Sequence, residues 1–423
     1  MKQTKKLRGS SLVVTVVIAL VLAILCSSLI LLAYYNRQNE QTSDIEFRLN
    51  NNIESAINLV LADSIIYVSL QTDRLDLFQE GNDSVVISRR LWGLFQVGDI
   101  NAFYGRFSRK KTFFYGSALP DSLNGCLYLA DHQRSLSLVR ETKLVGDAYL
   151  SKAGLKAGYI DQQGFSFDKL IEGEIKISNK ALPGLSEEVT GNIKNLLGIC
   201  HDTAQTKGMQ LYIDQDSIFR SFADVPLLIF KSGKTILENC NLNGQVIIFS
   251  DSILEISSTA MLKDVILVAP SIRIKEGFRG TVQAIANDSL IVENNCFLDY
   301  PSSLILQKRE TETLQNRLII GEGCKISGIV ISLCDNDDLY KSYIGMGAKT
   351  IINGVVYAMG YLNLGANVTG TVLTDFFIHK TPSVIYENYL ADIEINRKKL
   401  SGFFLASPLF KGQSKKGILQ WVN

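Results

Sequence analysis

The chain has few prolines and histidines and almost no net charge. Only 7 prolines occur in 423 residues, which is the composition of an ordered chain rather than a disordered one. Lysine and arginine (43) nearly balance aspartate and glutamate (42), so the formal net charge is +1. That balance gives no electrostatic basis for nucleic-acid binding. The 3 histidines are far apart and no cysteines follow the Cys-x-x-Cys spacing, so no zinc site is expected.

Signatures of catalysis are also missing. The sequence contains no Gly-rich phosphate loop and no nucleophile elbow. Polysaccharide-cleaving proteins built from stacked strands need two or three carboxylates on one face. Here Asp251 and Asp288 share a column of the repeat described below, but they are two repeats apart, with Ala269 or Pro270 between them. We therefore expect no catalytic residue, no cofactor and no small-molecule ligand, with a polysaccharide lyase or hydrolase as the alternative.

One acidic cluster deserves a separate interpretation. Asp335, Asp337 and Asp338 lie together with Asn336 in an insertion between repeats. Their oxygens are ligands that calcium accepts. A solvated loop explains the same residues more simply. We therefore expect no metal site, with calcium at these aspartates as the one alternative.

Charge is absent from residues 9–36, and this gap predicts a membrane anchor. The run is almost wholly aliphatic and as a helix spans roughly 40 Å, enough for a ~30 Å hydrocarbon core. Four basic residues precede it, which predicts a cytoplasmic N-terminus. Residues 1–36 are then a basic tip and one transmembrane helix of a single-pass protein in a bacterial inner membrane, with the bulk in the periplasm. The helix would contact the lipid bilayer through residues such as Ser11, Leu12, Val13, Leu22, Leu31 and Tyr35.

Two kinds of signal peptide fit the N-terminus less well. A secretory signal has a shorter apolar core and an Ala-x-Ala site, whereas this chain offers only Leu31-x-Ala33. A lipoprotein signal needs a small residue before the cysteine, but Leu25 precedes Cys26. Residues 6–12 (KLRGSSL) instead resemble the start of PilX-type minor pilins and pseudopilins. That resemblance covers about the first 60 residues and implies cleavage between Gly9 and Ser10. The chain departs from the family at Val14, where a glutamate is usual.

An amphipathic helix is expected at residues 37–70. Ile45, Leu49, Ile53, Ile57 and Val60 recur every three or four residues among polar neighbours. Two interpretations stay open, namely a stalk helix that caps the next domain and a pilin-like helix that packs into a filament. Residues 71–225 then read as a mixed, mainly β region of undetermined strand order, with 187–200 as its one helical candidate.

Residues 226–380 repeat with a period of about 20 residues, which is typical of stacked architectures. Each unit has short alternating strands separated by turns. One turn position is almost always Gly or Asn, the residues that reach a left-handed backbone most easily. This turn column comprises Asn239, Gly277, Asn295, Gly323, Gly347 and Gly365. The next position is mostly small and apolar, as the inside of a corner requires: Cys240, Ala260, Phe278, Cys296, Cys324, Ala348 and Ala366.

These columns predict a mainly β fold with a right-handed parallel β-helix (solenoid), and they resemble bactofilin-like solenoids. Residues 381–423 are expected to form a C-terminal cap. Cys296 and Cys324 fall in adjacent rungs, where Cα atoms about 5 Å apart suit either a disulfide or two buried small hydrophobes.

A last pattern is Asp-Ser or Asp-Thr before an aliphatic residue or alanine, at Asp63, Asp83, Asp121, Asp202, Asp216, Asp251 and Asp288. It resembles an O-glycan acceptor motif of periplasmic bacterial proteins, and turn chemistry is the alternative.

Two functions remain. The first is a structural or assembly protein of the cell envelope, with other envelope or pilus-like proteins as partners, in a pilus-like or type II secretion-like apparatus. The second is an envelope carbohydrate-active or glycan-binding protein.

Overall fold

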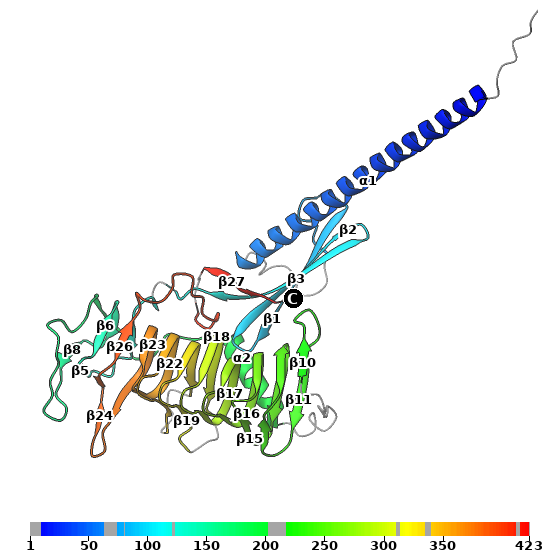
Figure 1. Cartoon of the computed structure of the whole chain (residues 1–423). Coiled ribbons are helices and arrows are strands. Elements are labelled where there is room, and N and C mark those ends of the chain that lie inside the picture. Colours follow the sequence, from blue (N-terminus) through cyan, green and yellow to red (C-terminus); the bar gives the residue numbers. More distant parts are fainter. Residues whose placement is uncertain are drawn as a thin grey trace, which may run out of the picture. The chain divides into compact units, whose positions relative to one another are not determined.

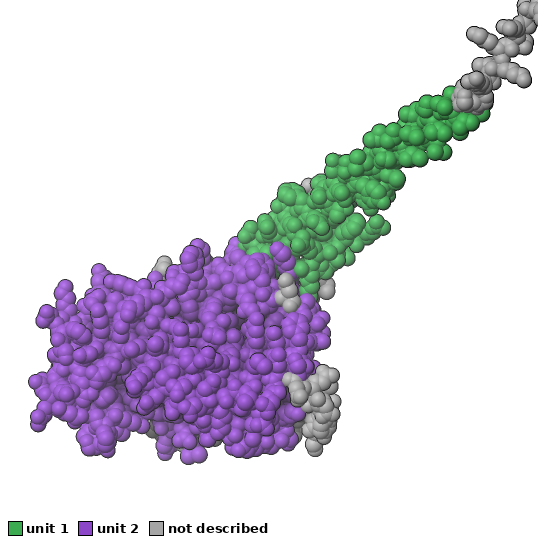
Figure 2. Space-filling model, in the orientation of Figure 1, with its two compact units in different colours: residues 1–60, 65–88, 100–110 green, residues 61–64, 89–99, 111–423 purple. Residues whose placement is uncertain are grey.

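The computed structural model describes residues 10–62, 74–79, 81–120, 123–201, 217–309, 314–334, 340–411 and 415–422. It is mainly β with one long N-terminal helix. The chain divides into two compact units, coloured separately in Figure 2. Unit 1 contains residues 1–60, 65–88 and 100–110, and unit 2 contains residues 61–64, 89–99 and 111–423.

Helix α1 (Ser10–Leu61) of 52 residues is the main element of unit 1. Every described side chain from Leu12 to Asp44 is exposed. Farther along, Leu49, Ile53, Ala56, Ile57 and Val60 are buried, which is the apolar face that the three- and four-residue spacing predicts. The two segments that the sequence divides at residue 36 therefore form one continuous helix.

Polar contacts fix the C-terminal half of α1 to strands in the same unit. The Asn52 amide donates to the Asp83 carboxylate at 2.7 Å, and both side chains are buried. Arg48 lies over the Tyr104 ring, with 5.6 Å from guanidinium carbon to ring centroid. The strands are β1 (Asp83–Trp92), β2 (Phe95–Tyr104) and β3 (Phe107–Ser117), which contribute residues to both units, and β27 (Lys416–Trp421) completes their sheet.

A stack of parallel strands dominates unit 2, with successive strands side by side in Figure 1. Each strand pairs with its counterpart one repeat later, so equivalent residues form columns. One inward column is apolar throughout: Ile229, Ile248, Leu267, Ala284, Leu304, Val330, Val356 and Val372. The long strands are β16 (Met261–Ile274), β17 (Arg279–Val292), β18 (Phe297–Gln307), β20 (Lys325–Leu333), β22 (Ile351–Leu364) and β23 (Asn367–Lys380).

Shorter strands complete the faces of the stack. They are β10 (Ser217–Arg220), β11 (Leu227–Lys231), β12 (Thr235–Leu237), β13 (Asn241–Gly244), β14 (Val246–Ser250), β15 (Ile253–Ile256), β19 (Arg317–Ile320) and β21 (Ser342–Met346). Strand β17 pairs with β18 through residues 279–286 and with β19 through residues 289–292. One strand thus turns a corner and serves two faces. As a result, the pairings among β17, β18, β20, β22, β21 and β19 close a ring of six parallel strands.

The stack does not end where the sequence repeat ends. Val372 of β23 pairs with Leu127 of β4 (Leu127–Leu129), and Leu127 pairs with Ala148 of β7 (Ala148–Leu150). Residues 127–177, which precede the repeat in the sequence, therefore add further rungs beyond β23. The strands of this end are β5 (Leu136–Val139), β6 (Lys143–Val145), β8 (Leu155–Ala157) and β9 (Ile175–Ile177).

Part of the segment expected to form the C-terminal cap (residues 381–423) is itself built into the stack. Strand β26 (Glu394–Asn396) pairs with β23 on one side and β6 on the other, so it is a rung within the stack and not a cover over its end. Strand β25 (Tyr389–Ala391) pairs with β5, and β24 (Ile385–Glu387) pairs antiparallel with β23. Residues 394–396 are held there because both edges of β26 find backbone partners.

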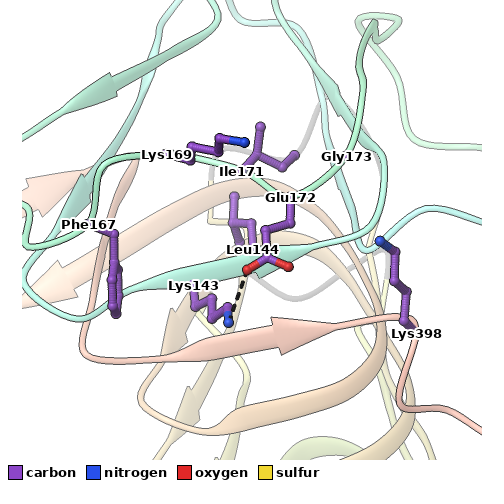
Figure 3. Close-up of a pocket in the computed structure, with 8 residues that line it drawn as sticks. All are labelled: Lys143, Leu144, Phe167, Lys169, Ile171, Glu172, Gly173 and Lys398. Carbon is purple, nitrogen blue, oxygen red and sulfur yellow. Dashed lines mark ion pairs between the residues drawn. The ribbon is translucent and has the colours of Figure 1, made fainter.

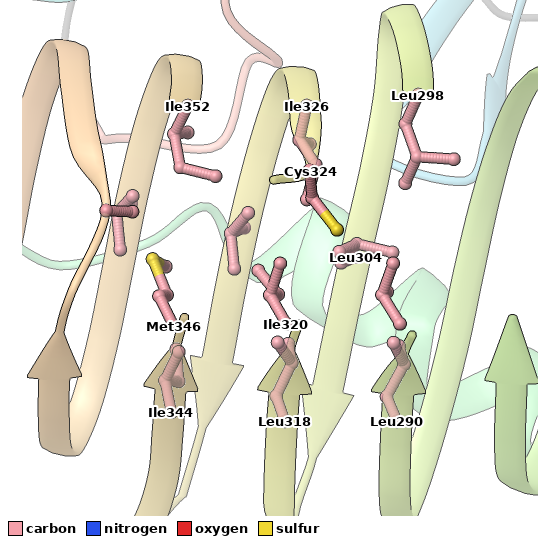
Figure 4. Packing of buried hydrophobic residues seen from close by; sticks show 14 of the residues in the cluster. Leu290, Leu298, Leu304, Leu318, Ile320, Cys324, Ile326, Ile344, Met346 and Ile352 are labelled. Carbon is pink, nitrogen blue, oxygen red and sulfur yellow. The ribbon is translucent and has the colours of Figure 1, made fainter. Parts of the chain in front are cut away.

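Two large apolar clusters lie in unit 2. The first lies inside the stack; Figure 4 shows Leu290, Leu318 and Ile344 with their neighbours from successive rungs. The second covers an outer face and includes Val189 and Ile193 of α2 (Glu187–His201). That helix matches the one predicted for residues 187–200.

The turn between β1 and β2 is clamped to this outer face by Gln283. The Gln283 side chain accepts from the Leu94 N–H at 2.8 Å and donates to the Trp92 carbonyl at 2.9 Å. Gln283 and Trp92 are both buried, so each of these hydrogen bonds satisfies a polar group that water does not reach.

Candidate functional site

The exposed apolar part of α1 is the first candidate site. In the described part of the chain, α1 is the one helix long and apolar enough to cross a membrane, with a mean hydropathy of 3.1 in its most apolar window. Leu12, Val13, Leu22, Leu31 and Tyr35 are 55–69% exposed, so the protein itself does not cover them. Ser10 and Ser11 lie in the first turn of the helix, and Gly9 lies outside the described residues.

The turn column behaves in two different ways. Asn239, Gly277, Asn295 and Gly323 have φ values from 50° to 78°, in the left-handed region. The prediction of a left-handed backbone is wrong for Gly347 and Gly365, which have no positive φ.

Close approach of the backbone explains those two glycines instead. A Cβ atom at Gly347 would lie 2.7 Å from the carbonyl carbon of Gly321, and one at Gly365 would lie 2.5 Å from the carbonyl oxygen of Met346. Both positions therefore need glycine for space rather than for conformation.

The structure contains a second glycine column, which the sequence analysis missed. Gly328, Gly354 and Gly370 have φ values of 143°, 146° and 150°. A Cβ atom at each would lie 1.8–2.0 Å from the carbonyl oxygen of the residue below it in the stack. The signal is present in the sequence, because each glycine is followed by an aliphatic pair or Thr-Val.

All seven cysteines are free thiols. Cys296 and Cys324 occupy adjacent rungs, as the repeat predicts, and both are buried. A side-chain hydrogen bond to Cys324 raises the pKa of Cys296, and burial raises it further. Elsewhere burial raises the pKa of Cys126 to about 12 and that of Cys200 to about 11, so these thiols stay protonated and unreactive at neutral pH.

The calcium candidates Asp335, Asp337 and Asp338 lie outside the described residues. Among the described residues, no group of three or more His, Cys, Asp or Glu side chains is placed to hold a metal ion. Asp251 accepts hydrogen bonds from the Ser232 hydroxyl at 2.8 Å and the Gly233 N–H at 2.6 Å, both in the preceding repeat, so its carboxylate joins the corners of two adjacent rungs.

A basic pocket lies near the end of the stack formed by residues 127–177. Its cavity of about 680 Å³ is lined by Lys143, Leu144, Phe167, Lys169, Ile171, Glu172, Gly173 and Lys398. Figure 3 shows Phe167 and Lys398 on opposite sides of the group, with Lys143 and Glu172 between them. The lining residues come from β6, from the segment before β9 and from the segment after β26.

Only one of the three lysines that line this basic pocket has an ion-pair partner among the described residues. Glu172 pairs with Lys143 at 3.0 Å. Lys169 and Lys398 are exposed and form no ion pair within the described part of the chain. Neighbouring charges are already committed, because Lys176 pairs with Asp147 at 2.7 Å and Lys399 pairs with Glu394 at 2.8 Å. The hydrogen bond from Lys176 lowers the pKa of Asp147, and that from Lys399 lowers the pKa of Glu394, so both carboxylates stay ionised.

Comparisons with known proteins do not assign the chain to a family. No protein-family model matches the chain, and no curated protein matches it. Among solved structures, the competence-associated pilin ComZ from Thermus thermophilus aligns over 84% of this chain and 86% of its own, with 9% identity and a TM-score of 0.25. A TM-score this low does not establish a shared fold.

Proposed function

We propose that the chain is a membrane-anchored structural or assembly protein of the bacterial cell envelope, and a minor component of a pilus-like or type II secretion-like apparatus. It is a single-pass protein of the inner membrane, with its N-terminus in the cytoplasm and its bulk in the periplasm. Its partners are the lipid bilayer and other envelope proteins.

The observation that carries this proposal is the change of character along α1. Its N-terminal half exposes an uncharged apolar surface on all sides, whereas Leu49, Ile53 and Ile57 bury one stripe against the protein. A helix that is apolar all round has no stable place in water, but it suits a bilayer or the packed interior of a filament. The sequence before it (residues 6–12) supports the pilin-like interpretation over a plain anchor.

In this proposal the parallel stack of unit 2 is a right-handed β-helix that acts as a rigid platform rather than a catalyst. Connections between parallel strands of one sheet are right-handed in about 98% of cases, which supports this handedness. Its columns are apolar or small, and the polar side chains that it buries, such as Gln283, bond to backbone. Such positions hold the fold together and do not present reactive groups.

Mass spectrometry of the mature N-terminus tests the pilin-like part of the proposal. We expect the purified protein to begin at Ser10, because residues 6–12 resemble a pilin cleavage site. A Gly9→Leu variant should keep the full-length N-terminus, since pilin-type cleavage follows a glycine. A wild-type chain that begins at Met1, or one cut between Ala33 and Tyr34, would contradict processing at Gly9.

A further inference from the structure

We propose that the basic pocket binds an anionic polysaccharide, with a carboxylate-bearing sugar unit held by Lys169 and Lys398 and its ring against Phe167. This inference is independent of the anchor and of the assembly role, because the pocket lies wholly within unit 2.

Charge defines the first requirement on the ligand. Three lysines face a single glutamate around the cavity, and Glu172 neutralises only Lys143. Lys169 and Lys398 form no close ion pair within the described part of the chain, although Lys398 also acts at longer range on Asp147, so both ammonium groups can meet an anion. Each ammonium is a point charge with three N–H donors. It can therefore bind carboxylates that approach from different directions along a sugar chain. Arginine, which binds carboxylate or phosphate in a bidentate way, does not line the pocket, so the anion would meet only single lysine charges.

Shape and apolar surface define the second requirement. A cavity of about 680 Å³ falls within the ~300–1,000 Å³ range of ligand sites. Phe167 is 46% exposed, so one part of its ring is available for contact. The C–H face of a sugar ring packs well on such a surface, while its hydroxyls reach the polar groups around it. Leu144 and Ile171 extend the apolar floor.

Free hydroxyls distinguish a saccharide from a DNA backbone. Glu172 lies in the centre of the group in Figure 3, where it can accept hydrogen bonds from sugar hydroxyls, which a DNA backbone lacks. A nucleic-acid site also relies on a broad positive field, and the whole chain carries a net charge of only +1. An anionic sugar polymer needs only local charge and a stacking surface.

Titration calorimetry with an oligogalacturonate tests the proposal on the full-length protein in detergent. Dextran of similar length serves as the neutral probe and oligothymidylate as the nucleic-acid probe. We expect the protein to bind oligogalacturonate and not dextran, with affinity that falls as salt rises. Lys169→Glu and Lys398→Glu should each weaken binding about tenfold, which corresponds to ~1.4 kcal/mol. Phe167→Ala should weaken oligogalacturonate binding without affecting any binding of inorganic phosphate.

Lys325→Glu is the matched control, because it makes the same charge change at an exposed lysine of β20 outside the pocket. It should leave the affinity unchanged. Absence of oligogalacturonate binding to the wild type would overturn the proposal. So would equal losses in Lys325→Glu and the two pocket variants, or oligothymidylate binding that is tighter than oligogalacturonate binding and lost in Lys169→Glu.

Discussion

A valine at Gly354 is expected to lower the free energy of unfolding of unit 2 by about 3 kcal/mol or more, through backbone strain and overpacking together. The φ angle of Gly354 is 146°, a conformation that β-branched residues resist. A Cβ atom there would lie 2.0 Å from the Gly328 carbonyl oxygen in the next rung. That oxygen belongs to the backbone of a paired strand, so it cannot move without breaking the ladder. The measurement is the urea midpoint of unfolding, followed by tryptophan fluorescence.

Gly402→Val is the matched control for this prediction. Gly402 has no positive φ, and nothing lies within 4 Å of a Cβ atom built on it. Its midpoint should stay within experimental error of the wild type. Gly347→Val should fall between the two, because its backbone is not left-handed but its Cβ atom would lie 2.7 Å from Gly321. Equal midpoints for Gly354→Val and Gly402→Val would contradict the close packing of glycines between rungs.

Two arginines in the apolar half of α1, as in the variant Leu22→Arg/Leu25→Arg, are expected to release much of the protein from the membrane. Both residues are more than half exposed and lie near the middle of the uncharged run. An arginine at the centre of a membrane helix costs about 2.5–3.5 kcal/mol on insertion scales, and the two positions lie on one helix face. The measurement is the fraction of full-length protein that stays in the membrane pellet after alkaline carbonate extraction.

The conservative variant Leu22→Ile/Leu25→Ile controls for changes in helix packing. It keeps the apolar surface and should remain in the pellet with the wild type. If the arginine variant also remained fully in the pellet, the apolar half of α1 would not be what holds the protein to the membrane.

The repeat could be predicted from the sequence because the same residue types recur at each corner and on each inward position. A corner that turns the backbone sharply selects Gly or Asn, and the aliphatic positions between corners must face inward, so both recur at each rung. The same reasoning failed at Gly347 and Gly365, because a glycine chosen for space and one chosen for conformation look identical in sequence. It also overlooked Gly328, Gly354 and Gly370, whose importance depends on the carbonyl oxygen of another rung.

Other features depend on contacts that sequence order conceals. Residues 127–177 extend the stack beyond β23, although more than a hundred residues separate Leu127 from its partner Val372. The basic pocket draws Lys143, Phe167 and Lys398 from three distant segments. No local pattern marks them, because each is an ordinary surface residue until the rungs bring them together.

The most direct test of the membrane-anchored, extracytoplasmic role is the location of the C-terminus. A phosphatase reporter that needs disulfides for activity, and so works only outside the cytoplasm, can be fused after Asn423 of the full-length chain. We expect this fusion to be active and a cytoplasm-dependent fluorescent reporter at the same position to be dark. An inactive phosphatase together with a bright fluorescent reporter would place units 1 and 2 in the cytoplasm and contradict the account.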